Sequence, residues 1–152
     1  MHSQPQRHAL HSCEHSLALG AGRDTEDTIY FHKDLTEKLI ACAIEVHRHL
    51  GPGLLESAYE ECYCYELKLQ GVSLERQKQL PLVYKEITLD CGYRMDVVAD
   101  KKVVIEIKCV EKILPIHEAQ LLTYLKLSGM QVGLIINFHS PTLKDGIKRF
   151  VH

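Results

Sequence analysis

The hydrophobic and polar positions of this chain follow two different periods, and each period predicts a type of element. Apolar residues recur every three or four positions over 34–50, 54–69 and 117–128, which predicts three helices. Apolar residues that alternate or run together predict strands at 72–76, 80–84, 87–89, 93–99, 103–109 and 132–137. This order of elements predicts an α/β domain with a central mixed β-sheet flanked by helices.

Cap and turn residues mark the ends of the first helix. Asp34-Leu35-Thr36-Glu37 has the layout of a capping box, in which Asp34 accepts hydrogen bonds from the first-turn amides. Gly51-Pro52-Gly53 ends the same helix, because proline cannot continue it. In the C-terminal stretch 141–152, apolar residues three or four positions apart predict a short terminal helix.

The strand at 103–109 combines an apolar run with two charged residues. Val103, Val104 and Ile105 are apolar on both faces, which is typical of a central strand covered by helices on each side. Glu106 and Lys108 follow, and since strand residues alternate, they point to the same face. A buried carboxylate and ammonium are costly unless they are paired or bind a metal ion, although a structural ion pair at a sheet end is the alternative.

A second carboxylate precedes this strand at Asp96. In an antiparallel hairpin, Asp96 faces Glu106 only if the turn is the three-residue loop Asp100-Lys101-Lys102, or if a bulge restores the register. We therefore expect the odd-length loop or a bulge. Two carboxylates and an ammonium would then converge, which suits a divalent cation and an activated water.

Residues 1–30 differ in composition from the rest of the chain. They are rich in His, Ser, Gln and Gly and show no sustained period, so a flexible N-terminal tail is expected there. The remaining stretch, 31–152, is expected to form a single domain, since a chain of 152 residues that is 45% hydrophobic can bury one sizeable core.

Net charge and hydropathy argue against some locations and binding partners. A formal net charge of −2 argues against tight non-specific binding to nucleic acid, although local basic patches remain open. No apolar run has the length of a membrane span and no signal-peptide layout is present, so we expect a cytoplasmic protein that does not associate with membranes. The six cysteines are expected to be free thiols.

Three short motifs resemble one family in order and spacing. Asp96, Glu106 and Lys108 are similar to the signature of the PD-(D/E)xK nuclease superfamily, with Met95 in place of the proline. Gly53-Leu54-Leu55-Glu56-Ser57-Ala58-Tyr59 matches the Gly-x-x-Glu-x-x-Tyr pattern of its GxxExxY branch. Gln120-Leu121-Leu122-Thr123-Tyr124 resembles the Gln-x-x-x-Tyr element of recombination-type nucleases.

The resemblance implies a restriction-endonuclease-like core and an activity. It implies a nuclease that depends on Mg²⁺ or Mn²⁺ and hydrolyses phosphodiester bonds of nucleic acid, with DNA as the expected substrate. Asp96, Glu106, the Ile107 carbonyl and Glu56 would hold the metal, and Lys108 would position or deprotonate the attacking water. An ordinary surface glutamate paired with a lysine is the alternative for Glu56.

The resemblance also implies substrate-binding residues, namely Gln120, Tyr124 and Tyr59. For the first two, the open alternative is that Tyr124 packs in the core and that Gln120 is merely polar. Two other functions stay open for the chain as a whole: a nuclease-fold binding or regulatory module that lacks turnover and acts with a partner protein, and a homo-oligomer in RNA or nucleotide metabolism.

Overall fold

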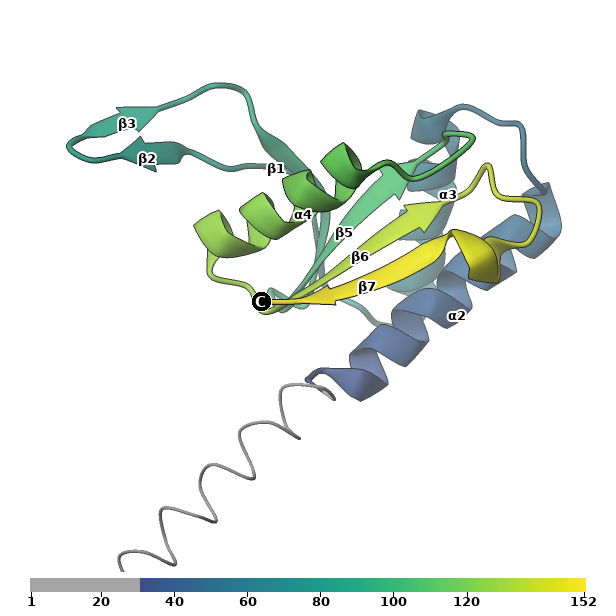
Figure 1. Ribbon diagram of the computed structural model, residues 1–152. Helices are drawn as coiled ribbons and strands as arrows, with labels where there is room; N and C mark the ends of the chain where they lie inside the picture. Colours follow the sequence, from purple (N-terminus) through teal and green to yellow (C-terminus); the bar gives the residue numbers. More distant parts are fainter. Residues whose placement is uncertain (1–30) are drawn as a thin grey trace, which may run out of the picture. The chain divides into compact units, whose positions relative to one another are not determined.

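The computed structural model describes residues 31–152, and these form a mixed β-sheet with helices on both faces (Figure 1). The predicted tail at residues 1–30 lies outside the described residues. The helices are α2 (Lys33–Leu50), α3 (Glu56–Leu69) and α4 (Pro115–Ser128). Pro115 suits the first turn of α4, where its missing N–H leaves no helical bond unmade.

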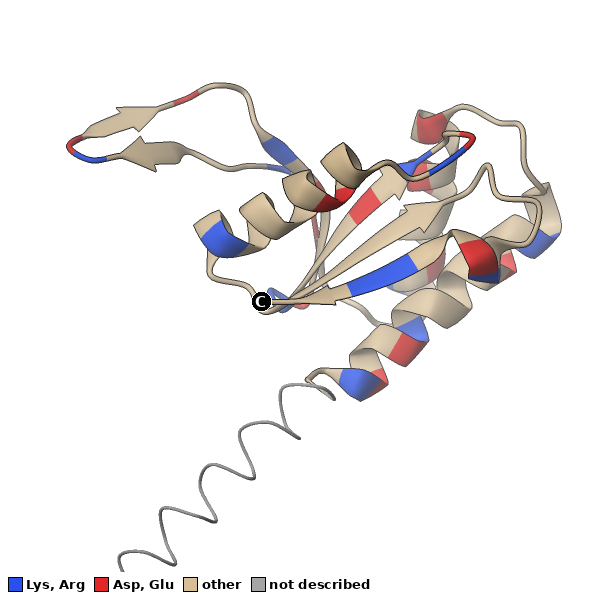
Figure 2. Ribbon diagram, in the orientation of Figure 1, with Lys and Arg blue, Asp and Glu red and all other residues tan. Residues whose placement is uncertain are grey.

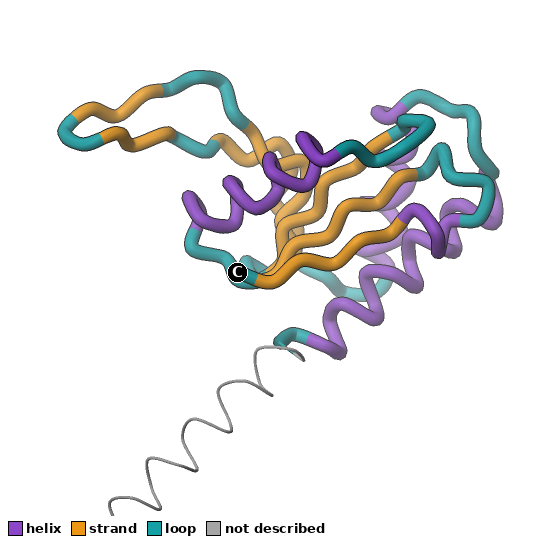
Figure 3. Tube along the Cα trace, viewed as in Figure 1, coloured by secondary structure: helices purple, strands orange, loops and turns teal. Residues whose placement is uncertain are grey.

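The main sheet has five strands in the order β1-β4-β5-β6-β7. Only the β5–β6 pair is parallel, and the other neighbours are antiparallel. Figure 3 shows these strands as one layer. The strands are β1 (Leu74–Gln79), β4 (Arg94–Ala99), β5 (Val103–Lys108), β6 (Val132–Asn137) and β7 (Ile147–Val151). The predicted mixed sheet is therefore confirmed.

The core lies in the middle of the sheet, on β5 and β6. Every residue of β6 is buried, and in β5 only Lys108 is partly exposed. Figure 1 shows α4 over one face of the sheet and α2 and α3 over the other. The apolar run at the start of β5 therefore marks a central strand covered on both sides, as predicted.

The turn between β4 and β5 has the length that the register requires. Val97 pairs with Ile105 and Ala99 with Val103, which leaves Asp100, Lys101 and Lys102 as the loop. The expectation of an odd-length loop is confirmed.

The C-terminal stretch differs from the predicted helix. It forms a short 3₁₀ turn, η1 (Leu143–Gly146), and then strand β7 along the edge of β6. Over so short a stretch, apolar residues three or four positions apart are compatible with both a helix and a strand. The strand prevails because the backbone groups on the open edge of β6 require partners.

The start of the first helix also differs from the prediction. The helix begins at Lys33, and its cap residue, His32, has a left-handed backbone and no capping side chain. Asp34 therefore lies inside the first turn rather than at the cap. There its negative charge still interacts favourably with the positive end of the helix dipole.

A two-stranded hairpin made of β2 (Leu82–Tyr84) and β3 (Ile87–Leu89) forms a sheet of its own (Figure 1). It leaves the body of the domain between β1 and β4. The hairpin exposes large apolar side chains, since Val83 and Tyr84 are each 59% exposed and Ile87 is 52% exposed. Apolar surface gathered on a projecting element is characteristic of binding surfaces.

Two further expectations concern chemistry rather than fold. Cysteines 42, 62, 64, 91 and 109 are free thiols, as predicted for them. Among the described residues, no helix combines the length and apolar character that crossing a membrane requires.

Helix α4 approaches the sheet most closely at Gly133 on β6. A Cβ atom at this position would lie 2.8 Å from Cδ1 of Leu121, which is fully buried on α4. The absence of a side chain at Gly133 therefore sets the distance at which α4, with Gln120 and Tyr124, lies over the sheet.

We expect Gly133→Val to destabilise the protein by about 1–3 kcal/mol, because the added methyl groups overpack the interface with Leu121. Urea unfolding of wild type and variant gives the difference in the free energy of unfolding. In a Leu121→Ala background the same substitution should cost less, since the clashing side chain is gone. Additive effects of the two substitutions would contradict this explanation.

Candidate active site

Two carboxylates from neighbouring strands meet between β4 and β5. The register that pairs Val97 with Ile105 places Asp96 directly opposite Glu106, so both side chains lie on one face of the sheet. The Asp96 amide donates to Oε1 of Glu106 at 3.3 Å, and the Ile107 amide donates to Oδ2 of Asp96 at 2.9 Å. The Asp96 carboxylate thus occupies the position of the backbone partner that the Ile107 amide would have on β4.

This exchange opens the sheet at one point. Backbone pairing between β4 and β5 runs from Ala99 to Val97 on β4, and side-chain bonds replace it at Asp96. Because the N–H and C=O of one strand residue point to the same side, the Ile107 carbonyl is directed toward β4, as its amide is. Two carboxylates and one carbonyl oxygen therefore surround the opening.

Burial and nearby negative charges change the ionisation of this pair. Glu106 is only 4% exposed, and its burial, followed by the negative charge of Asp96, raises its pKa to about 8. Burial also raises the pKa of Asp96, and the charge of Glu60 adds to this effect. Without a bound cation, the pair therefore holds a proton near neutral pH.

Lys108 supplies positive charge to this cluster. It lies two residues after Glu106 on β5 and therefore on the same face, as predicted. Its charge lowers the pKa of Glu56, Asp96 and Glu106 alike, which places it within electrostatic reach of all three carboxylates. Figure 2 shows acidic and basic residues spread over helices and strands alike.

Glu56 begins α3 and lies at the surface on the approach to the pair. Partial burial and then the charge of Asp96 raise its pKa, so the two acids interact. Within residues 31–152, however, no three His, Cys, Asp or Glu side chains are arranged together as a ready metal site. The structure brings Asp96 and Glu106 together and leaves Glu56 outside direct contact.

Tyr59, expected to contact substrate, lies in the interior. It is fully buried and its ring stacks on Phe138 at 4.7 Å between centroids. Its hydroxyl donates to the carbonyl of Gly51 and accepts from the amide of Leu54. Tyr59 therefore holds the loop before α3 and so positions Glu56, and its placement leaves no surface for a substrate.

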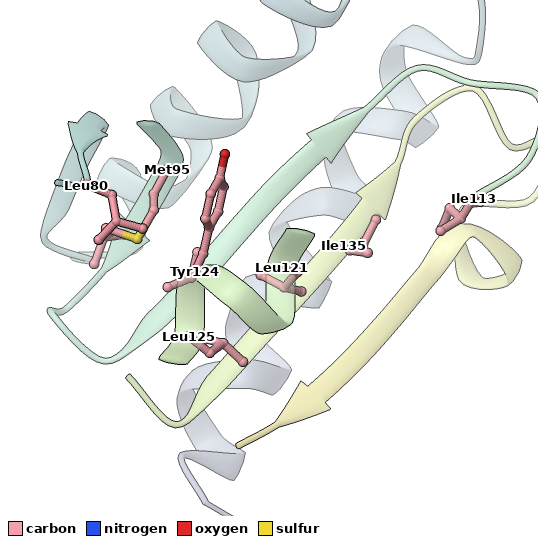
Figure 4. Close-up of a cluster of buried hydrophobic side chains, with 9 residues drawn as sticks. Leu80, Met95, Ile113, Leu121, Tyr124, Leu125 and Ile135 are labelled. Atoms are coloured by element: carbon pink, nitrogen blue, oxygen red, sulfur yellow. The ribbon is translucent and has the colours of Figure 1, made fainter. Parts of the chain in front are cut away.

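Gln120 and Tyr124 lie on the side of α4 that faces the pair. The Gln120 amide donates to the Tyr124 hydroxyl at 3.1 Å. The Tyr124 ring is 5% exposed and belongs to a buried apolar cluster, and Figure 4 shows its hydroxyl directed away from that cluster. After burial itself, the charges of Glu106 and Asp96 contribute most to the raised pKa of Tyr124, so this hydroxyl lies near both.

Sequence reasoning missed three residues around the pair. Glu60, one turn after Glu56, accepts hydrogen bonds from Arg76 and from Gln77, and the Gln77 amide also reaches Oδ1 of Asp96 at 3.5 Å. The third is Asn137, whose buried side chain binds the backbone of Val110 and so anchors the chain after Lys108. A lone polar residue ending the apolar run of β6 was the available signal for Asn137. Gln77 and Glu60 gave no such signal.

The donors at the opening fit a hard divalent cation. Mg²⁺ is commonly held by one or two carboxylates and keeps several water ligands, so it does not need three protein side chains. Glu106 is buried and Asp96 is half-buried, and their raised pKa values indicate negative charge that lacks full compensation. A cation between them would supply that compensation, and the Ile107 carbonyl is a suitable third oxygen ligand.

The ionisation of Glu106 gives a testable effect on stability. Because its folded-state pKa of about 8 exceeds its ordinary value of 4.5, the protonated form stabilises the fold. This contribution is complete below 4.5 and is lost as the pH rises from 4.5 to about 8.

Glu106→Gln resembles the protonated acid, so we expect it to match wild type near pH 5 and to be ~2–4 kcal/mol more stable near pH 9. Urea unfolding in EDTA at each pH measures the free energy of unfolding of both proteins. A constant difference across this pH range would contradict the proposed ionisation of the pair.

Comparison with protein families gives an independent result. The family model described as "PD-(D/E)XK nuclease superfamily" matches residues 33–150. No curated protein and no solved structure is similar enough to match. The match spans more than half of the chain and contains both strands of the carboxylate pair as well as α3 and α4. The chain therefore belongs to the PD-(D/E)XK nuclease superfamily.

Proposed function

We propose that this protein is a metal-dependent nuclease that hydrolyses phosphodiester bonds of DNA. Proteins of this superfamily are typically nucleases and generally use divalent metal ions. The observation that carries the proposal is the meeting of Asp96 and Glu106 at the opening between β4 and β5, with Lys108 on the same face. A buried glutamate beside a second carboxylate destabilises a sheet unless the two acids have a further role, such as holding a cation.

Asp96, Glu106 and the Ile107 carbonyl would hold the metal, which is Mg²⁺ or Mn²⁺ in this proposal. A bound divalent cation neutralises charge on the scissile phosphate and lowers the pKa of water. Glu56 would act through a water molecule, because it lies near Asp96 without direct contact. The Tyr59 hydroxyl supports this role by holding the loop that leads to Glu56.

Lys108 positions the attacking water and stabilises the negative charge that develops at phosphorus. The water oxygen loses a proton and forms a bond to phosphorus in line with the 3′ oxygen. The bond from phosphorus to the 3′ oxygen breaks, and that oxygen takes up a proton from solvent, so one proton is released and one is taken up. Gln120 and Tyr124 would contact the substrate from α4, since their hydrogen-bonded pair lies beside the carboxylates.

Lys108→Ala is expected to lower the rate of DNA cleavage by about 10²–10⁴-fold, because it removes the group that orients and polarises the water. Cleavage of supercoiled plasmid with Mg²⁺ or Mn²⁺ measures the effect. Lys112→Ala is the matched control, since Lys112 is an exposed lysine on the loop that follows the same strand.

Calorimetry with Mn²⁺ completes this experiment. Wild type should bind Mn²⁺, and Asp96→Asn should weaken binding by removing a ligand charge. Unchanged cleavage by Lys108→Ala would refute the proposed role of Lys108. Mn²⁺ binding without cleavage of any DNA or RNA substrate would instead identify a module that lacks turnover.

A further inference from the structure

A cavity of about 480 Å³ opens between α4 and the base of the β2–β3 hairpin. Its walls are mostly apolar, with a few polar groups, and this composition is typical of small-molecule sites. Tyr93, just before β4, lies at its rim with 44% of its surface exposed. The lining also includes Leu82 of the hairpin and Gln120 and Tyr124 of α4.

This cavity adjoins the carboxylate pair. Tyr124 forms part of the cavity wall and also lies within electrostatic reach of Glu106 and Asp96. A ligand in the cavity would therefore lie beside the catalytic pair, with Tyr124 between them.

We propose that the cavity binds an unpaired nucleobase, so that the substrate is a single strand or a frayed end. The inference rests on the nuclease function proposed above. The exposed ring of Tyr93 can stack on a base, and Gln120 can donate or accept hydrogen bonds at its edge. A base within a duplex is already stacked and paired and cannot enter.

The test is binding of a short single-stranded oligodeoxynucleotide, and of its blunt duplex, by fluorescence anisotropy in EDTA. Tyr93→Ala should weaken single-strand binding about tenfold through the lost stacking, and Tyr93→Phe should retain it. Duplex binding should not change. Tyr65→Ala is the matched control, because Tyr65 is an exposed tyrosine on α3 that does not line the cavity.

Equal binding by wild type and Tyr93→Ala, or equal losses with single strand and duplex, would overturn the base site. If a second copy of the chain fills the cavity instead, Tyr93→Ala will change sedimentation and leave single-strand binding unaltered, which also overturns it. Because no metal is present, these outcomes are separate from the cleavage assay that tests the nuclease function.

A second, independent observation concerns Gln77 on β1. Arg76 pairs with Val97 and Lys78 with Met95, so Gln77 lies opposite Asp96, but it is absent from the ladder. Its φ of 48° lies in the left-handed region, and among the described residues it is the one member of a strand with such a backbone. For a residue other than glycine this conformation is strained.

The strained backbone aims the Gln77 side chain at two acids. Its amide donates to Oε1 of Glu60 at 2.7 Å and reaches Oδ1 of Asp96 at 3.5 Å. Arg76 holds the other Glu60 oxygen at 2.8 Å, and the Glu60 side chain is only 12% exposed. Gln77 thus links a fixed carboxylate on α3 to Asp96.

We infer that Gln77 is a positioning residue that holds Asp96 in its metal-binding orientation. This inference also rests on the proposed function. It explains why strain is retained at this point of β1, since a regular strand would turn the amide away from Asp96. Outer contacts of this kind commonly affect metal affinity by about 10–100-fold.

Gln77→Gly tests the inference, because glycine adopts the left-handed backbone without strain and lacks the amide. We expect an equal or higher melting temperature for the metal-free protein, together with about tenfold weaker Mn²⁺ binding in calorimetry. Gln77→Asn should behave similarly in binding, since asparagine tolerates this backbone but is one methylene shorter.

A lower melting temperature with unchanged Mn²⁺ affinity would show a purely structural role and overturn the inference, as would unchanged values of both. Wild-type protein that binds no Mn²⁺ is a different result, because it refutes the metal-dependent function itself. The melting temperature supplies a measurement that does not depend on activity.

Discussion

The structure depends on one local exchange of hydrogen bonds between β4 and β5. Where the backbone ladder would continue past Val97 and Ile105, the Asp96 carboxylate accepts the Ile107 amide hydrogen instead, and the Glu106 carboxylate accepts the Asp96 amide hydrogen. This opens the sheet, holds two acids close together and directs the Ile107 carbonyl to the same place. Burial raises the pKa of both acids, and the charge of Asp96 adds to the shift of Glu106, so the metal-free fold carries an energetic cost at this point.

The rest of the domain offsets this energetic cost and supplies the residues that surround the pair. The buried strands β5 and β6 form a rigid base, covered by α4 on one face and by α2 and α3 on the other (Figure 1). Each covering layer brings one polar contact toward the pair: the Gln120–Tyr124 bond from α4, and the Glu60–Gln77 bond between α3 and β1. The stability of the core thus offsets the cost of strain and uncompensated charge at the site. Functional sites in proteins commonly have this cost.

Prediction succeeded where the physical cause was local to the chain. The apolar run before Glu106 identified the central strand, and the alternation of side chains placed Lys108 on the same face. The predicted loop at Asp100–Lys102 followed from register alone. Prediction failed for residues 141–152 because the decisive partner, the open edge of β6, is a long-range contact. It failed for Tyr59 because a motif position does not reveal whether a side chain points inward.

The amino-acid sequence alone was sufficient to predict the alternating faces of each strand, the ends of most helices and the family resemblance. These features depend on residues that are close to one another along the chain. The meeting of α3, β1 and β4 around Asp96 could not be inferred in that way. No periodicity or motif in the sequence marks Gln77. Its left-handed backbone can be explained only by the contacts of its side chain with Glu60 and Asp96. The cavity beside Tyr124 likewise exists only because a projecting hairpin and a helix come together in the folded chain. Tertiary structure decides such features because they depend on contacts between distant segments.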